Sequence, residues 1–95
     1  FKGGLTENYV NMQLTISGYK TYYWVSQRGA EVDFIIQKEG KIIPIEVKSA
    51  DNTKAKSLQS YIKTYRPDYA IKLSSRNFSM DNGIKTVPLY AAFCI

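Results

Sequence analysis

Ninety-five residues make one small domain with a single core, because a chain of this length buries only about 60 to 65% of its unfolded surface. The hydrophobic fraction of 44% and the charged fraction of 22% exclude an intrinsically disordered chain, and no window approaches the roughly eighteen apolar residues of a membrane span. The excess of five positive charges favours nucleic acid or another polyanion as a partner, although many small domains with such a charge bind none.

The first residues of the sequence and its single cysteine suggest what kind of chain and which compartment the domain comes from. The sequence begins at Phe1 rather than methionine, and residues 2–4 lead directly into a helical pattern, so we expect residues 1–95 to be one domain cut from a longer chain. Cys94 lies in an apolar tail without an intrachain partner, which predicts a small core residue and a reducing, cytoplasmic compartment. The N-terminus shows no basic region followed by an apolar run, which argues against an export signal.

The first predicted element is a helix over residues 5–16. Its apolar residues recur at spacings of four, three and four, at Leu5, Tyr9, Met12 and Ile16. Val10 and Leu14 form a second stripe almost opposite the first, so we predict burial on two sides. Glu7 lies one turn before Val10 in that second stripe, and its carboxylate is therefore predicted to point inward, which is unusual for a charged group.

Three strands are predicted next, the first over residues 19–26, where tyrosine, tryptophan and valine give a high β propensity. Apolar positions 32, 34 and 36 alternate with Glu31, Asp33 and Ile35, and positions 43, 45 and 47 alternate with Pro44, Glu46 and Lys48. The second and third strands are therefore each expected to have one apolar face and one face that carries charge. Pro44 has no N–H, so it must lie where no donor is needed, or at a bulge that shifts the pairing.

The second and third strands are predicted to form a hairpin, because residues 39–40 (Glu-Gly) suit a two-residue turn. In that register Asp33 lies directly across from Glu46, and Glu31 lies across from Lys48, all on one face.

A helix, two strands and a surface loop are predicted in the second half. Residues 51–53 offer helix caps, and an amphipathic helix follows through Leu58 to Tyr65, before Pro67. Strands are expected over residues 69–73 and 84–90. The polar segment 74–83 between them is predicted to be a loop.

The opposed Asp33 and Glu46 carry the candidate chemistry. Two carboxylates about 5 Å apart repel each other by about 3 kcal/mol at an effective dielectric constant near 20, so a counter-charge is needed. Mg²⁺ takes oxygen ligands and accepts phosphate oxygens as further ligands. With Glu7 as a third carboxylate and Lys48 beside the phosphate or the attacking water, the predicted reaction is hydrolysis of a phosphodiester.

A purely structural interpretation of the same residues is also open. The strand charges are common on a solvated sheet face, where Lys48 would pair with Glu31 and Asp33 would lie near Arg28. Glu7 would then be a carboxylate that meets the dipole at a helix start. The combination of an inward-facing Glu7 with the strand pair favours the metal site.

The same residues resemble a known group of proteins. Glu7 in the first helix, Asp33 after residues 31–32, and Glu46 followed by Lys48 two residues later resemble the PD-(D/E)XK nuclease-like superfamily. Residues 4–10, 23–24, 44–49 and 88–90 are similar to the uncharacterised domain that follows an AAA+ ATPase module in many prokaryotic proteins. The resemblance covers nearly the whole chain.

The resemblance implies an α/β fold, with a restriction-endonuclease-like αβββαβ core in which helices flank a mixed central sheet. It also implies the catalytic residues Glu7, Asp33, Glu46 and Lys48, of which the three carboxylates bind Mg²⁺ or Mn²⁺. Two departures are present. Val32 replaces the proline before Asp33, and Ser57 stands where helicase-nuclease relatives carry a glutamine followed by leucine, two residues and tyrosine. The second departure leaves the nuclease subtype open.

Two hypotheses follow from the sequence. In the first, the chain is a metal-dependent deoxyribonuclease domain whose partners are DNA and an N-terminal AAA+ ATPase module in the same chain. In the second, the same fold is a catalytically silent module that binds nucleic acid or protein, with exposed aromatics such as Tyr19, Tyr22 and Tyr65 at the contact surface. A membrane partner is not expected, and a homo-oligomer is compatible with both hypotheses.

Overall fold

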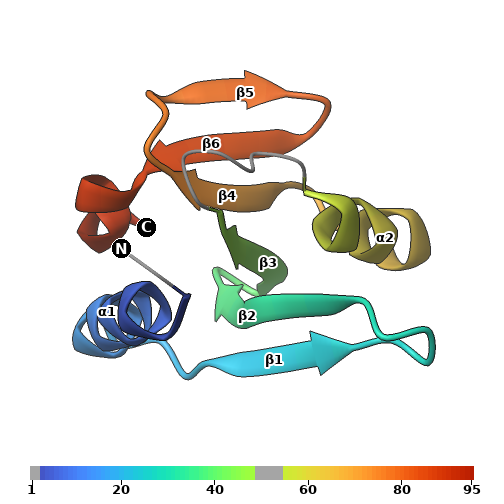
Figure 1. Ribbon diagram of the computed structural model, residues 1–95, viewed down its shortest axis with the longest axis horizontal. Helices are drawn as coiled ribbons and strands as arrows, with labels where there is room; N and C mark the ends of the chain where they lie inside the picture. The colour runs from blue at the N-terminus through green and yellow to red at the C-terminus, as the bar shows by residue number, and fades with distance from the viewer. Residues whose placement is uncertain (1–2, 49–54) are drawn as a thin grey trace.

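A mixed six-stranded sheet with helices on both faces forms the fold, which is therefore of the α/β class (Figure 1). The computed structural model describes residues 3–48 and 55–95. In chain order the elements are α1 (Gly3–Ile16), β1 (Tyr22–Val25), β2 (Glu31–Lys38), β3 (Lys41–Val47), α2 (Lys56–Tyr65), β4 (Ala70–Ser74), β5 (Ser79–Asp81), β6 (Ile84–Pro88) and the 3₁₀ helix η1 (Leu89–Cys94). No helix within these two stretches has the length and apolar character to cross a membrane.

The strands are ordered β1-β2-β3-β4-β6-β5. β1, β2 and β3 pair antiparallel as a meander, β4 is parallel to both β3 and β6, and β5 closes the other edge antiparallel to β6. The change from antiparallel to parallel pairing occurs at β3, because α2 carries the chain across the sheet before β4 begins. β3 is therefore a central strand with neighbours on both sides.

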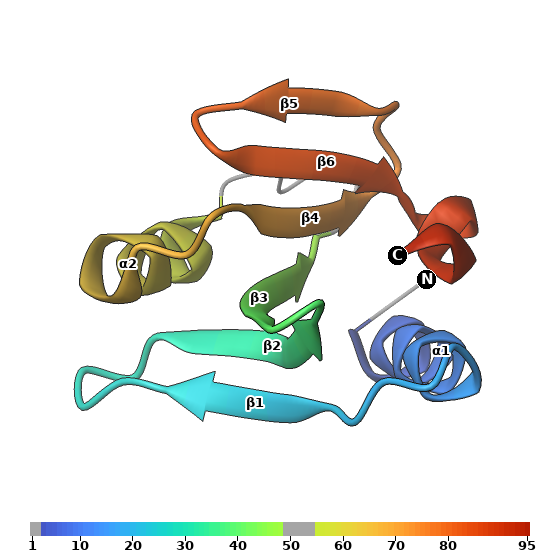
Figure 2. The same cartoon turned by 180° about the vertical axis from the view of Figure 1, so that it is seen from behind.

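Apolar side chains form one core on each face of the sheet, with α1 and η1 on one side and α2 on the other (Figures 1 and 2). The first core joins both helical elements to the central strands through Val10, Leu14, Phe34, Ile36, Ile43, Ile45, Ile71, Leu73, Val87, Ala91 and Ala92. The second joins α2 to the opposite face through Val32, Ala55, Leu58, Tyr61 and Ala70. Neighbouring residues of one strand thus belong to different cores, as Ala70 and Ile71 of β4 do.

Helix α1 is buried on one side only, which corrects the prediction of two buried stripes. Val10 and Leu14 are fully buried, as expected. Leu5, Met12 and Ile16 are instead 70%, 52% and 72% exposed. Helical spacing identifies a stripe but does not say whether the protein supplies a surface to cover it, and here the sheet reaches only one side of α1.

The β2–β3 hairpin has the predicted register. Phe34 pairs with Ile45 and Lys38 with Lys41, and the turn residues Glu39 and Gly40 have φ angles of 54° and 78°. Two consecutive positive φ angles are typical of a type I′ turn, which matches the twist of the strands. Pro44 stays within the ladder without shifting it.

The second half of the chain contains a hairpin where a loop was predicted. β4, α2 and β6 lie close to their expected positions, but β5 forms within the polar segment and turns back through Asn82 and Gly83, whose φ angles are 51° and 78°. The dipeptide Asn-Gly is itself a strong hairpin signal. Cys94 is exposed, so its prediction as a core residue was wrong. The predicted caps at residues 51–53 lie outside the described residues.

Candidate functional site

A β-bulge in β2 places Asp33. Val32 and Ile35 both pair with residues of β1, but two residues separate them on β2, whereas only Tyr23 separates their partners on β1. The extra residue makes a bulge at Asp33 and Phe34. Val32 and Ile35 consequently both pack on the α2 side, while Phe34 packs on the α1 side. The predicted strict alternation along β2 was therefore wrong at this point.

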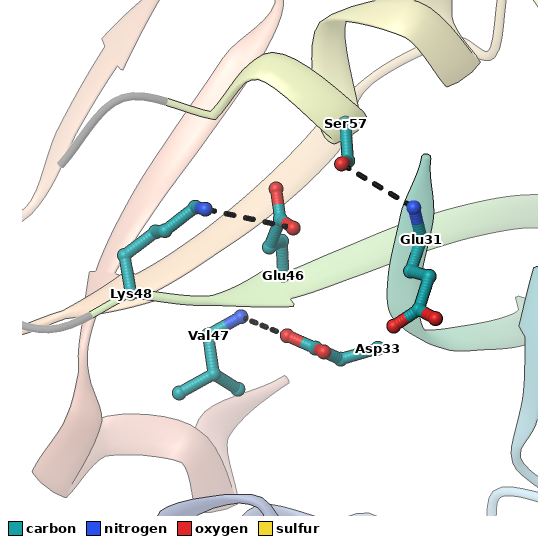
Figure 3. A network of polar contacts seen from close by, with 6 residues as sticks. All are labelled: Glu31, Asp33, Glu46, Val47, Lys48 and Ser57. Carbon is teal, nitrogen blue, oxygen red and sulfur yellow. Dashed lines mark hydrogen bonds and ion pairs between the residues drawn. The ribbon is translucent and has the colours of Figure 1, made fainter. Parts of the chain in front are cut away.

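Asp33 is held by the backbone of the neighbouring strand. Beyond the pair of Phe34 with Ile45, the Oδ2 atom of Asp33 accepts a hydrogen bond of 2.8 Å from the N–H of Val47 (Figure 3). The Asp33 side chain thus accepts the hydrogen bond from Val47 that a backbone carbonyl of β2 would accept if the strands continued to pair. Asp33 does not stand on one face opposite Glu46, as the simple hairpin register predicted, but reaches between the two strands.

Glu46 and Lys48 project from β3 on the α2 side, opposite to Val47 (Figure 3). The Glu46 side chain is only 6% exposed, and its Oε1 lies 3.7 Å from the Nζ of Lys48. Its Oε2 atom is buried and finds no hydrogen-bond partner among the described residues. The N–H of Leu58 near the start of α2 favours the charged carboxylate but completes no hydrogen bond to Oε2. A buried carboxylate oxygen without a partner is costly.

The two strand carboxylates have raised pKa values. Burial raises the pKa of Asp33, and the hydrogen bond from Val47 and the charge of Lys48 offset this in part. Burial also raises the pKa of Glu46, Lys48 lowers it, and the charge of Asp33 raises it further. The charge of Asp33 thus acts on Glu46, and the charge of Lys48 only partly compensates for the burial of both carboxylates.

Glu7 lies at the edge of this group and is exposed, so the prediction of a buried, inward-facing carboxylate was wrong. Partial burial raises its pKa, and the charges of Asp33 and Glu31 raise it further. The carboxylate is therefore within electrostatic reach of the site. Across residues 3–48 and 55–95, no three side chains of His, Cys, Asp or Glu are gathered closely enough to form a metal shell. Glu7 thus does not close a three-carboxylate group in this arrangement.

Glu31 was not selected from the sequence, yet it belongs to the electrostatic group. It pairs with Val25 of β1 and lies outside the β2–β3 register, which ends at Phe34 and Ile45. Its N–H donates to the Ser57 hydroxyl of α2 at 3.3 Å. Its charge raises the pKa values of both Asp33 and Glu7. The position two residues before Asp33 on the same strand is the signal that identifies it.

The donor set fits Mg²⁺ or Mn²⁺ as a two-carboxylate site. The carboxylates of Glu46 and Asp33 offer hard oxygen donors and have raised pKa values, and the buried Oε2 of Glu46 has no hydrogen-bond partner among the described residues. Mg²⁺ in proteins commonly takes one or two carboxylates and completes its shell with water and substrate phosphate. A cation bound by these carboxylates would offset the burial of Glu46 and the charge of Asp33 that raises its pKa.

Comparison with known proteins gives one result. A search of curated proteins finds no match. Residues 2–92 match the family described as Domain of unknown function (DUF4143). Because this match spans nearly the whole chain, the protein belongs to the DUF4143 family.

Proposed function

We propose that this chain is a metal-dependent phosphodiesterase domain that acts on DNA, built around Asp33, Glu46 and Lys48. The observation that carries the proposal is the buried Oε2 of Glu46, which lacks a partner while a second carboxylate raises its pKa. A protein gains no stability from this arrangement. It becomes favourable when a divalent cation and its phosphate ligand are bound.

Each residue then has a role. Bound Mg²⁺ or Mn²⁺ would polarise the phosphoryl group and lower the pKa of a bound water. The carboxylates of Glu46 and Asp33 would hold the cation. Lys48 stands within 3.7 Å of Glu46 and stabilises negative charge on the phosphate oxygens. The oxygen of the attacking water bonds to phosphorus and gives up a proton to solvent, one P–O ester bond breaks, and the departing oxygen takes up a proton from solvent.

Glu7 acts from outside this inner group. As an exposed carboxylate whose pKa is raised by the charge of Asp33, it adds negative potential that attracts the cation. This role replaces that of a direct ligand.

The fold supports a PD-(D/E)XK assignment. The order α1-β1-β2-β3-α2-β4 is the αβββαβ order that the resemblance implies, and the β2–β3 hairpin carries Asp33 and Glu46. We extend the proposal to the context of such domains, as part of a cytoplasmic protein with an AAA+ ATPase module.

A binding module without catalysis is the second candidate. The exposed aromatics Tyr22 and Tyr65, at 55% and 56%, favour it because such side chains serve contact surfaces well. Tyr19 is half-buried and donates its hydroxyl hydrogen to the carbonyl of Ile95, so it belongs to the structural scaffold instead.

Plasmid nicking separates the two candidates. Purified protein with Mg²⁺ or Mn²⁺ is expected to nick supercoiled DNA, and Asp33→Asn or Glu46→Gln to abolish nicking. Glu39→Gln removes the same charge at the exposed hairpin turn and is expected to nick normally. Wild-type protein that binds the metal but leaves DNA intact would overturn the proposal of a phosphodiesterase and support the binding module. Equal nicking by all variants would identify a contaminating nuclease.

A further inference from the structure

A lysine-lined cleft lies between α2 and the β4, β6 and β5 part of the sheet. It has a volume of about 660 Å³, and Lys56, Lys63 and Lys72 line it together with Asp81. Its floor is apolar, with Ala55, Ile62 and Ile84. Asp81 and Asn82 at the β5–β6 turn line the cleft, and this turn lies at the same end of the molecule as α2 (Figure 1). We call these lysines and their apolar floor the lysine cleft.

The lysine cleft is connected to Glu46 through Lys72, which lines the cleft and pairs with Glu46 on the neighbouring strand. Glu46 on β3 pairs with Lys72 on β4, and Lys72 pairs with Thr86 on β6, so the three residues form one row across the sheet. Paired residues of neighbouring strands, about 4.8 Å apart, point to the same face. Thr86 and Lys72 both line the cleft. A polymer bound with one phosphate at Glu46 would therefore have the lysine cleft on the next strand of the sheet.

From this continuity we infer that the lysine cleft binds the backbone of a single nucleic-acid strand that leads to the carboxylates. The inference deepens the proposed function, on which it rests for the position of the reacting phosphate. Lys56 and Lys63 lie one on the first turn of α2 and one near its end, and both are exposed. They can contact successive phosphates along the helix, because ammonium groups bind backbone phosphates as point charges.

The size and lining of the cleft favour one strand over a duplex. A volume of about 660 Å³ falls within the range of roughly 300–1,000 Å³ that encloses a ligand of small-molecule size. Unpaired bases expose apolar faces, and the floor of Ala55, Ile62 and Ile84 offers an apolar surface to them. A duplex keeps its bases stacked inside and presents only phosphates, so it gains nothing from that floor.

Charge reversal tests the inference without relying on cutting. Binding is measured by fluorescence anisotropy with a short labelled DNA strand and with the matching duplex, in EDTA so that no metal acts. Lys56→Glu combined with Lys63→Glu is expected to weaken single-strand binding by about tenfold or more. The slope of log affinity against log salt should fall by about 1.4, as expected for two lost phosphate contacts on a single strand.

A matched control makes the same change of net charge elsewhere. Lys20→Glu combined with Lys85→Glu alters exposed lysines outside the cleft and is expected to change affinity by less than about threefold. If the cleft variant unfolds, as seen by circular dichroism, Lys56→Gln with Lys63→Gln takes its place.

The outcomes separate this inference from the proposed function. Three results would each overturn the inference that the lysine cleft binds a single strand. They are an equal loss of affinity in the cleft and control variants, duplex binding as tight as single-strand binding, and no binding by the wild type. Selective loss of binding in a protein that never nicks DNA supports the cleft and refutes the nuclease. Cutting of the labelled single strand at the wild-type rate by the variant that lacks Lys56 and Lys63 supports the nuclease and refutes the inference on the cleft.

Discussion

The carboxylate of Asp33 on β2 accepts a 2.8 Å hydrogen bond from the backbone N–H of Val47 on β3, at the point where the two strands cease to pair. One oxygen therefore completes the sheet, and the other remains for the site. This double use follows from the β-bulge, because the extra residue in β2 turns Asp33 away from the regular alternation.

Substitutions of Asp33 should separate its structural role from its chemical one. Asp33→Ala leaves the Val47 N–H without its acceptor and is expected to cost about 1–3 kcal/mol of unfolding free energy. Asp33→Asn keeps an acceptor oxygen and should retain most of the stability, yet both variants should lose nicking. Urea unfolding measures the first effect. Equal destabilisation by the two substitutions would show that the hydrogen bond is not the source.

The stability of the metal-free protein should fall as pH rises through the acidic range. Burial raises the pKa values of Asp33 and Glu46 above 3.8 and 4.5, so the folded chain holds protons that the unfolded chain has released. Stability is therefore greatest below these ordinary values and declines until pH exceeds the folded values. Glu46→Gln should flatten this decline and be as stable as the wild type at pH 7, or more stable by about 1 kcal/mol. Thermal unfolding of the wild type and of Glu46→Gln between pH 3 and 8, in EDTA, measures the decline and its flattening. A wild-type stability that rises with pH contradicts the raised pKa values of Asp33 and Glu46.

Local patterns in the sequence predicted the elements and the hairpin register well. The Glu39-Gly40 turn fixes the pairing of β2 with β3, because two residues with positive φ leave one register for the strands. The bulge beside Asp33 could not be foreseen in the same way. It depends on how β1 pairs with β2 and on the two cores that lie on opposite faces, which are both tertiary features.

The α1 helix shows why the candidate site was only partly predictable. Its two apolar stripes are equally clear in the sequence, but only the stripe with Val10 and Leu14 meets the sheet. The spacing of Glu7 from Val10 assigned its carboxylate to the buried side of α1. Glu7 is instead exposed, because it lies at the edge of the helix face that contains Val10. Glu46 and Lys48, by contrast, were placed correctly on a common side of β3, since strand alternation there is undisturbed.

Metal binding should distinguish Glu7 from Glu46. A cation that binds only the folded chain stabilises it by about 2.7 kcal/mol at a concentration of 100 times its Kd, and this appears as a rise in Tm. Glu46→Gln should abolish the rise produced by Mg²⁺ or Mn²⁺. Glu7→Gln should weaken the metal affinity by less than about tenfold, because an exposed carboxylate contributes through its field and not as a ligand. A complete loss in Glu7→Gln would restore Glu7 as a direct ligand.

The last prediction concerns Lys48, whose charge lowers the pKa values of both Asp33 and Glu46. Lys48→Met keeps an unbranched side chain one atom shorter than lysine and removes the charge, so both carboxyl groups should hold their protons to higher pH. Metal binding, followed by the Tm shift, should then weaken in mildly acidic solution and recover at higher pH. Once both carboxylates are ionised, the affinity should at least equal that of the wild type, because a neighbouring cation has been removed.

Nicking by Lys48→Met should respond differently from metal binding. If Lys48 stabilises charge on the phosphate, the rate should stay about 100-fold lower or more even at the pH where metal binding has recovered. Lys48→Arg, which keeps the charge, should restore the wild-type pH dependence of metal binding and serves as the control. Recovery of nicking by Lys48→Met in step with metal binding would instead mean that Lys48 acts only through the carboxylates and takes no part in stabilising the phosphate.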